Sequence, residues 1–164
     1  MKSKILYLCN AGMIAALYVV LTLIANSLGL ANGAVQVRFS EALTILPIFT
    51  ASAIPGLVVG CLISNILTGC ILPDIIFGSI ATLLGALGTR ALRKIKPRIL
   101  AAFPPVISNM LIIPFILTYA YHIPGSLFFN MATVGLGELI SCVVLGGILL
   151  TPLTPLKDKV FEDR

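Results

Sequence analysis

The residues of this chain that could do chemistry are few, and they stand at the edges of or inside long apolar stretches. The run VQVRFSEALTILP, residues 35–47, places Gln36, Arg38 and Glu41 close together at the start of a long uncharged stretch. Charged side chains in such a position are costly unless they are paired, and they usually serve a ligand or an ion. We therefore expect this run to form part of a binding site inside a membrane protein.

Glu138 is the second informative acid, because it lies near the middle of a predicted membrane helix. An isolated carboxylate there costs several kcal/mol unless it is paired, hydrogen-bonded or protonated. Gly135, Ser141 and Cys142 lie on its face at helical spacing and are small, which leaves room for a ligand or another helix. A hydrogen bond to a neighbouring helix is the alternative, and we favour a ligand contact.

Three further polar residues are candidates for the same site. Asn109 precedes Met110, whose carbonyl loses its helical partner because Pro114 has no N–H. Such a kink can present polar groups in an apolar environment, although it can also simply fit the packing. Asn65 and Asp74 lie at the outer end of one predicted helix and in the connection that follows it.

Counting charges constrains the ligand. Three acids, Glu41, Asp74 and Glu138, face the single cation Arg38 in this region. An ion pair between Arg38 and Glu41 across one helical turn would still leave at least one acid free. The count therefore favours a ligand with hydrogen-bond donors and a positive charge over an anion.

The composition indicates which elements position these residues. Of the 164 residues, 59% are hydrophobic and 10% are charged, and the mean hydropathy is +1.10, which is typical of a polytopic membrane protein and not of a soluble domain. Six spans of about 20 residues use nearly the whole chain, so we predict one integral membrane domain over residues 1–164. The chain lacks G-x-x-x-x-G-K-[ST], HExxH and GxSxG motifs and has one histidine, His122. We therefore expect no enzyme.

The pattern of apolar stretches predicts six transmembrane helices. The expected ranges are about 5–30, 41–54, 55–72, 75–92, 99–121 and 127–150, with the last ending at Thr151-Pro152. Pro55-Gly56 breaks helical geometry and favours two segments in the middle. The segment 41–54 is short for a full crossing, so a tilted or re-entrant segment is also compatible with it.

The basic residues predict the topology. Lys2 and Lys4, the five cations between Arg90 and Arg98, and Lys157 with Lys159 form three clusters. By the positive-inside rule all three belong in the cytoplasm, and six spans place them there together. Both termini are then cytoplasmic, and the candidate binding residues face outward or lie deeper in the membrane. The net charge of +5 thus reflects topology and not nucleic-acid binding.

The four cysteines, Cys9, Cys61, Cys70 and Cys142, are scattered without CxxC spacing. We interpret them as buried small residues and predict no disulfide, metal or cofactor.

Four runs carry a resemblance to a known family. VQVRFSEALTILP, IPGLVVGCLISNILTG, DIIFGS and NMATVGLGE together resemble the QueT family, the substrate-binding S components of energy-coupling factor (ECF) transporters, over about residues 35–150. The resemblance implies a six-helix S-component fold in the bacterial cytoplasmic membrane. It also implies a queuosine precursor as substrate, a 7-deazaguanine such as 7-aminomethyl-7-deazaguanine or queuine. The energy would come from two ATPase subunits through a transmembrane T subunit, with the S component toppling in the membrane.

The resemblance also bears on the first helix. Ala11 and Ala15 form a small-xxx-small pair, which by itself favours close packing inside this protein. The similar AxxxA of S components makes docking onto the T subunit the favoured interpretation.

In the expected mechanism the acids Glu41, Asp74 and Glu138 accept hydrogen bonds from the base. The amides of Gln36, Asn65 and Asn109 orient the base, and Arg38 holds Glu41 or contacts the base carbonyl. Two alternatives stay open: an S component for another vitamin-like cation, and a small helical assembly protein without a ligand.

Overall fold

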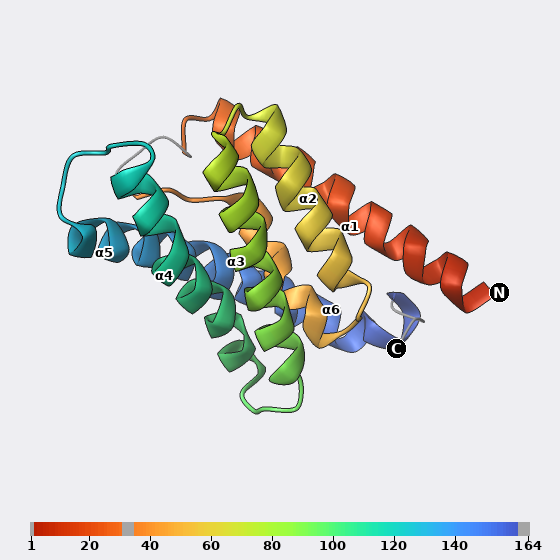
Figure 1. The fold of residues 1–164 in the computed structure, drawn as a ribbon. Coiled ribbons are helices and arrows are strands. Elements are labelled where there is room, and N and C mark those ends of the chain that lie inside the picture. The colour runs from red at the N-terminus through yellow and green to blue at the C-terminus, as the bar shows by residue number, and fades with distance from the viewer. Residues whose placement is uncertain (1, 31–34, 161–164) are drawn as a thin grey trace.

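The computed structural model describes residues 2–30 and 35–160, and within these ranges every regular element is a helix (Figure 1). This confirms the predicted all-helical membrane fold. Four helical stretches are long and apolar enough to cross a membrane: Lys4–Ser27, Leu72–Ala91, Arg98–Tyr119 and Leu127–Leu156. In chain order the elements are α1 (Lys2–Ser27), η1 (Phe39–Ile48), α2 (Ala53–Leu67), α3 (Leu72–Ala91), η2 (Arg98–Ala102), α4 (Phe103–Tyr119), α5 (Leu127–Glu138), η3 (Leu139–Leu145) and α6 (Gly146–Val160).

Glycines allow α1 and α2 to pack closely. A Cβ added at Gly56 would lie 2.7 Å from the carbonyl oxygen of Ala11, and one added at Gly60 would lie 3.0 Å from that of Ala15. Small residues four apart let two helix backbones approach in an apolar environment, where van der Waals packing supplies much of the association energy. Gly56 and Gly60 therefore allow α2 to pack directly against the backbone of α1.

η1 occupies the middle of the bundle and differs from the expected α-helix over 41–54. It is a 3-10 helix, and eight of its residues from Ser40 to Ile48 are buried. Pro47 lacks an N–H and crowds the carbonyl of Leu43, which disfavours α-helix, while Thr44 Oγ1 donates to the carbonyl oxygen of Glu41 at 2.6 Å. The predicted helix type and boundary were therefore wrong.

The length of this part of the chain is still enough for a crossing. An extended residue advances about 3.3 Å and a 3-10 residue about 2 Å, so residues 35–48 laid end to end span at most roughly 33 Å. The hydrocarbon core of a bilayer is about 30 Å thick. An extended segment followed by a 3-10 helix thus takes the place of the short α-helix expected from the sequence.

α3 and α4 form a second close pair. A Cβ added at Gly85 would lie 2.7 Å from Pro105 Cα, and one added at Gly88 would lie 2.5 Å from Pro104 Cβ. The two prolines occupy the first turn of α4, where a missing N–H costs little. Their rings fill the space that the glycines leave, and the predicted stretch 99–121 is confirmed as η2 followed by α4.

α5, η3 and α6 make one long helical rod, in which η3 is a π-helix. The rod continues to Val160, so the predicted end at Thr151-Pro152 was wrong. The hydroxyls of Thr151 and Thr154 bond carbonyls one turn back, at 3.2 and 2.8 Å. Membrane helices tolerate proline where such side chains support the backbone nearby.

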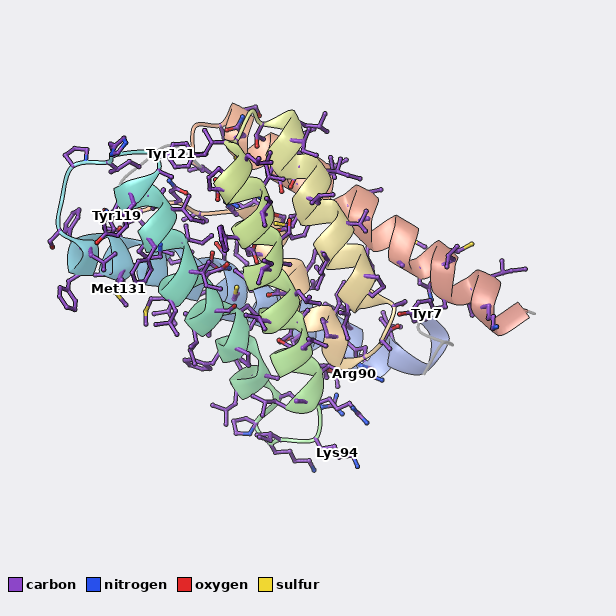
Figure 2. The ribbon with its side chains drawn as sticks, viewed as in Figure 1. Tyr7, Arg90, Lys94, Tyr119, Tyr121 and Met131 are labelled. Atoms are coloured by element: carbon purple, nitrogen blue, oxygen red, sulfur yellow. The ribbon has the colours of Figure 1, made fainter. Side chains whose placement is uncertain are left out.

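The outer surface of the bundle is apolar, and basic residues mark one of its two ends. Large hydrophobic side chains are exposed around it, among them Leu8, Phe77 and Phe128. Figure 2 shows Arg90 and Lys94 at the end opposite Tyr121, and Figure 1 shows both termini on the side away from the α4–α5 connection. This arrangement suits a lipid-facing surface, while the cytoplasmic orientation of the termini stays a prediction.

Candidate functional site

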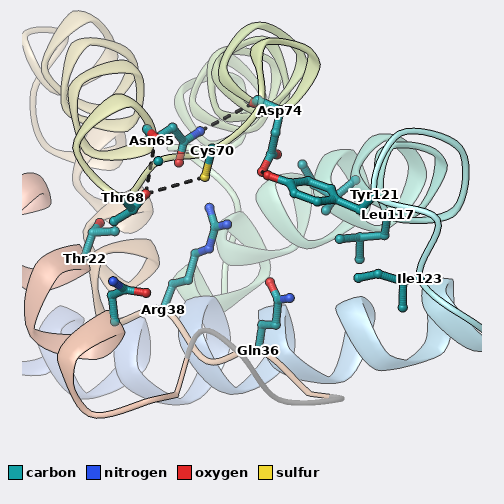
Figure 3. Close-up of a pocket in the computed structure, with 13 residues that line it drawn as sticks. Thr22, Gln36, Arg38, Asn65, Thr68, Cys70, Asp74, Leu117, Tyr121 and Ile123 are labelled. Carbon is teal, nitrogen blue, oxygen red and sulfur yellow. Dashed lines mark hydrogen bonds between the residues drawn. The ribbon is translucent and has the colours of Figure 1, made fainter.

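A cavity of about 330 Å³ lies among the helices, and a pocket of about 20 Å³ adjoins it. We call them the large cavity and the small pocket; both are lined by Gln36, Arg38 and Ile113. The structure brings all seven sequence-predicted binding residues to one or both of these spaces. Asn65 and Asp74 line the large cavity (Figure 3), Glu41, Asn109 and Glu138 line the small pocket, and Gln36 and Arg38 line both.

Gln36 and Arg38 reach the site from an extended segment that crosses the rod. The backbone N–H of Arg38 donates to Ser141 Oγ at 3.1 Å. A Cβ added at Gly137 would collide with the carbonyl of Gln36, so only glycine allows this crossing. Figure 3 shows the Arg38 side chain among the residues that line the large cavity.

The acid nearest in sequence to Arg38 has a different partner. Glu41 on η1 is 2% exposed and accepts a hydrogen bond at Oε1 from the hydroxyl of Tyr18 on α1. Its Oε2 is buried and has no hydrogen-bond partner among the described residues. Within that part of the chain Arg38 and Glu41 form no ion pair, so the suggested pairing across one helical turn is not what the fold uses.

Tyr18 is a residue that the sequence analysis missed. Tyr18, Thr22 and Asn26 recur every four residues on an otherwise apolar helix, which places them on one face. Thr22 and Asn26 line the large cavity, and Thr22 Oγ1 donates to Ser40 Oγ at 2.8 Å. This polar stripe is the signal that could have identified them.

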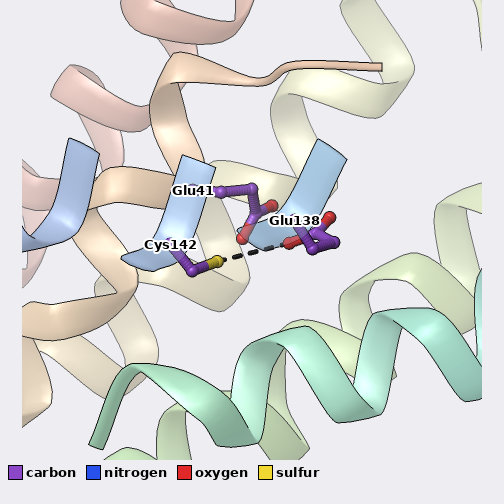
Figure 4. Close-up of side chains that lie close together, drawn as sticks. All are labelled: Glu41, Glu138 and Cys142. Atoms are coloured by element: carbon purple, nitrogen blue, oxygen red, sulfur yellow. Dashed lines mark hydrogen bonds between the residues drawn. The ribbon is translucent and has the colours of Figure 1, made fainter. Parts of the chain in front are cut away.

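Glu138 stands where α5 passes into the π-helix η3. It is 9% exposed, and Cys142 Sγ donates to its Oε2 at 3.3 Å (Figure 4). Thr44 Oγ1 on η1 lies 3.5 Å from Cys142 Sγ. π-Bulges are rare and often occur at functional sites. Cys61 and Cys142 are buried as expected, whereas Cys9 is exposed and Cys70 is half-buried, so the interpretation of all four cysteines as buried was wrong for these two. Cys142 also contacts a candidate binding acid, which the sequence did not indicate.

Asp74 lies in the first turn of α3, where the helix dipole favours a negative charge. The hydroxyl of Tyr121 donates to Asp74 Oδ2 at 3.1 Å and accepts from the backbone N–H of Ile71 at 3.2 Å. Burial raises the pKa of Tyr121 above its usual range, so this phenol remains protonated and remains a donor at neutral pH. The Asn65 amide lies 3.5 Å from the Asp74 carbonyl, close to the glycine at position 78.

Asn109 is brought to the site by α4. Its side chain is 4% exposed and lines the small pocket together with Glu138. Ile113, one turn further along α4, lies between the two spaces and lines both. Pro114 follows inside the helix, as the sequence analysis noted. The position of the amide therefore agrees with that of a ligand-orienting group.

The small residues of α1 divide between two surroundings. Ala15 is 8% exposed and faces α2 at Gly60, and Ala11 is half-buried beside Gly56. Gly12 and Ala16 are exposed. Close packing inside the protein is therefore one function of the alanine pair, and docking of a partner at Ala11 and Ala15 stays a prediction.

Comparison with known proteins adds an independent observation. The family model described as QueT transporter matches residues 8–155. A protein described as queuosine precursor transporter QueT, from Lactococcus lactis subsp. cremoris (strain MG1363), is 36% identical over 64 residues, which are 39% of this chain and 38% of that protein. The alignment thus spans well under half of the relative. No solved structure matches the chain.

Proposed function

Because the chain belongs to the QueT transporter family and is a multi-pass protein of the bacterial cell membrane, we propose that it is the substrate-binding S component of an ECF importer. Its substrate is a queuosine precursor, a 7-deazaguanine captured from outside the cell. It is not an enzyme: it binds and carries the base without changing it. The protein similar to it is described as a queuosine precursor transporter, which supports the substrate class.

The observation that carries this proposal is the convergence of seven polar residues on two adjoining spaces inside an apolar bundle. Ligand sites are usually concave, mostly apolar and supplied with a few convergent polar groups. The large cavity of about 330 Å³ falls in the ordinary size range for a small organic ligand. Over the two spaces together, the three acids Glu41, Asp74 and Glu138 outnumber Arg38, which suits a base that presents N–H donors.

The residues divide the work according to where they lie. Asp74, which accepts a hydrogen bond from Tyr121, and the Asn65 amide form one wall of the large cavity. Their oxygens accept hydrogen bonds from the N–H groups on the pairing edge of the base. Gln36 and Arg38 meet the base where the large cavity joins the small pocket, with the guanidinium donating to the base carbonyl. Glu41, Asn109 and Glu138 surround the deepest part of the site.

Transport requires partners that supply energy. In this proposal α1 docks through the Ala11 and Ala15 region onto a T subunit, which is coupled to two ATPase subunits, and the S component topples to release the base inside. Gly12 and Ala16, which neighbour that pair and are exposed, support this by offering a face of small residues on which a second helix can approach closely.

The test is ligand binding by the purified full chain in detergent or nanodiscs. Titration with a panel of 7-deazaguanines and with guanine should give saturable binding for at least one deazaguanine and weaker binding for guanine. Asp74→Asn should weaken this binding by about tenfold, which corresponds to about 1.4 kcal/mol, because it replaces an acceptor oxygen by a donor. Absence of saturable binding by every deazaguanine would refute the proposed function.

A further inference from the structure

The small pocket contains an unusual pair of acids. Glu41 comes from η1 and Glu138 from the end of α5, and side-chain ligand atoms of Glu41, Glu138 and Cys142 all lie within 4.8 Å of one another (Figure 4). Both carboxylates are almost fully removed from solvent, at 2% and 9% exposed. Two acids this close and this deep are costly unless protons or a cation compensate them.

The hydrogen bonds around the acids leave one buried acceptor oxygen without a partner among the described residues. Tyr18 donates to one Glu41 oxygen, and Cys142 donates to Glu138. The second oxygen of Glu41 is buried and without a partner in the described part of the chain. A buried acceptor left in this state costs about 1 to 3 kcal/mol or more, and a charged donor placed beside it removes that cost.

The size of the small pocket restricts what the donor can be. A volume of about 20 Å³ accommodates roughly one water-sized group, since a cavity that holds a single water needs a volume of at least about 10 to 15 Å³. A primary ammonium group has that size and carries three N–H donors. A guanidinium or a substituted amine is too large for the same space.

The surrounding donors favour an ammonium group over a metal ion. Cys142 donates a hydrogen bond to Glu138, and a metal ion bound here would break it, because a metal-binding cysteine must lose its proton. The cationic Arg38 also lines the small pocket, and its repulsion of a divalent ion is about twice its repulsion of a singly charged ammonium group at the same distance. An ammonium group needs only acceptors, and the two carboxylates supply them.

We propose that the small pocket between Glu41 and Glu138 is a subsite for a primary ammonium group of the ligand, whose flat uncharged part occupies the large cavity. The inference rests on the proposed function and deepens it by selecting among deazaguanines. A 7-aminomethyl group meets the two acids as a cation. A 7-cyano group lacks donors, and the substituted amine of queuine is too bulky for the small pocket.

The test compares two ligands of similar shape on the same protein. Calorimetric titration of the purified full chain with 7-aminomethyl-7-deazaguanine should give at least tenfold tighter binding than 7-methyl-7-deazaguanine, which lacks the ammonium group, and tighter binding than queuine. Because this comparison uses the unchanged chain, it holds even if a variant fails to fold. Equal affinity for the amine and the methyl analogue would overturn the ammonium subsite while leaving the proposed function intact.

A variant and a chelator complete the test. Glu138→Gln should lower the preference for the amine over the methyl analogue at least fivefold, because one carboxylate is lost; an unchanged preference would remove Glu138 from the subsite. Addition of a chelator should leave the affinity for the amine unchanged, and a loss of affinity would mean that a metal ion and not the ammonium group lies between the acids. Failure of both ligands to bind the unchanged chain would instead refute the proposed function.

Discussion

Gly137 offers the sharpest test of how the fold builds the site, because it touches no proposed ligand. A Cβ added there would overlap the carbonyl oxygen of Gln36 and lie 3.0 Å from its carbonyl carbon and 3.3 Å from its nitrogen. Favourable carbon–carbon contacts begin near 3.5 Å. These obstacles are backbone atoms, so a rotamer change cannot relieve them, and in Gly137→Ala the extended segment must move away from α5.

The expected loss of stability follows from the contacts that this movement disturbs. Overpacking of this kind costs about 1 to 3 kcal/mol. Loss of the Arg38 N–H bond to Ser141, 3.1 Å long, adds about 1 kcal/mol, so the variant should lose roughly 2 to 4 kcal/mol of stability. Gln36 and Arg38 line both spaces of the site, and we expect deazaguanine binding to weaken at least tenfold.

The assay is thermal unfolding of the purified protein together with calorimetric binding. Gly12→Ala on α1 is the matched control, because a Cβ there meets nothing within 4 Å. That change should keep binding unchanged and stabilise the helix by about 0.5 to 1 kcal/mol. If Gly137→Ala matches the unchanged protein in both melting temperature and affinity, the extended segment does not hold the position described here.

Three further predictions concern topology, docking and the wall of the large cavity. In a background without native cysteines, a cysteine at Lys96 should resist an impermeant thiol reagent in intact cells and one at Gly125 should react; labelling at Lys96 would overturn the cytoplasmic assignment. Ala16→Leu, at an exposed position, should reduce uptake and leave ligand binding intact. Ala15→Leu should also lower the melting temperature, because Ala15 is only 8% exposed. Unchanged uptake in Ala16→Leu would mean that the exposed face of α1 around Ala16 meets no partner. Tyr121→Phe removes the donor to Asp74 and should weaken binding about three- to tenfold, with a similar melting temperature; unchanged affinity would show that this hydroxyl does not position the acid.

The class of the protein and its candidate site residues could be predicted from the sequence. A carboxylate in a long apolar stretch, such as Glu138, is expensive wherever the fold places it, so its presence alone indicates a special role. The same reasoning identified Glu41 and Asp74, and all three line the cavities. Hydrophobic length likewise predicted the helical membrane fold, because backbone groups in lipid must bond within the segment.

Hydrogen-bond partners were not predictable, because they join elements far apart in the chain. Tyr18 donates to Glu41 across 23 positions, and Arg38 reaches Ser141 across 103. The expected neighbour pair of Arg38 and Glu41 follows from helical spacing, but the chain is extended at Arg38 and a 3-10 helix after it. Spacing rules apply only once the local conformation is known.

The local conformation itself depended on packing. η1 is enclosed on nearly all sides, so its tight 3-10 geometry is set by the helices around it as well as by Pro47. The π-helix after Glu138 has no distinguishing composition in an apolar run. Hydrophobicity and the cost of burial are properties of single residues, so the sequence alone determines them. The direction of Glu41 and Glu138 toward one pocket depends on how neighbouring elements fill space, and only the tertiary structure decides that.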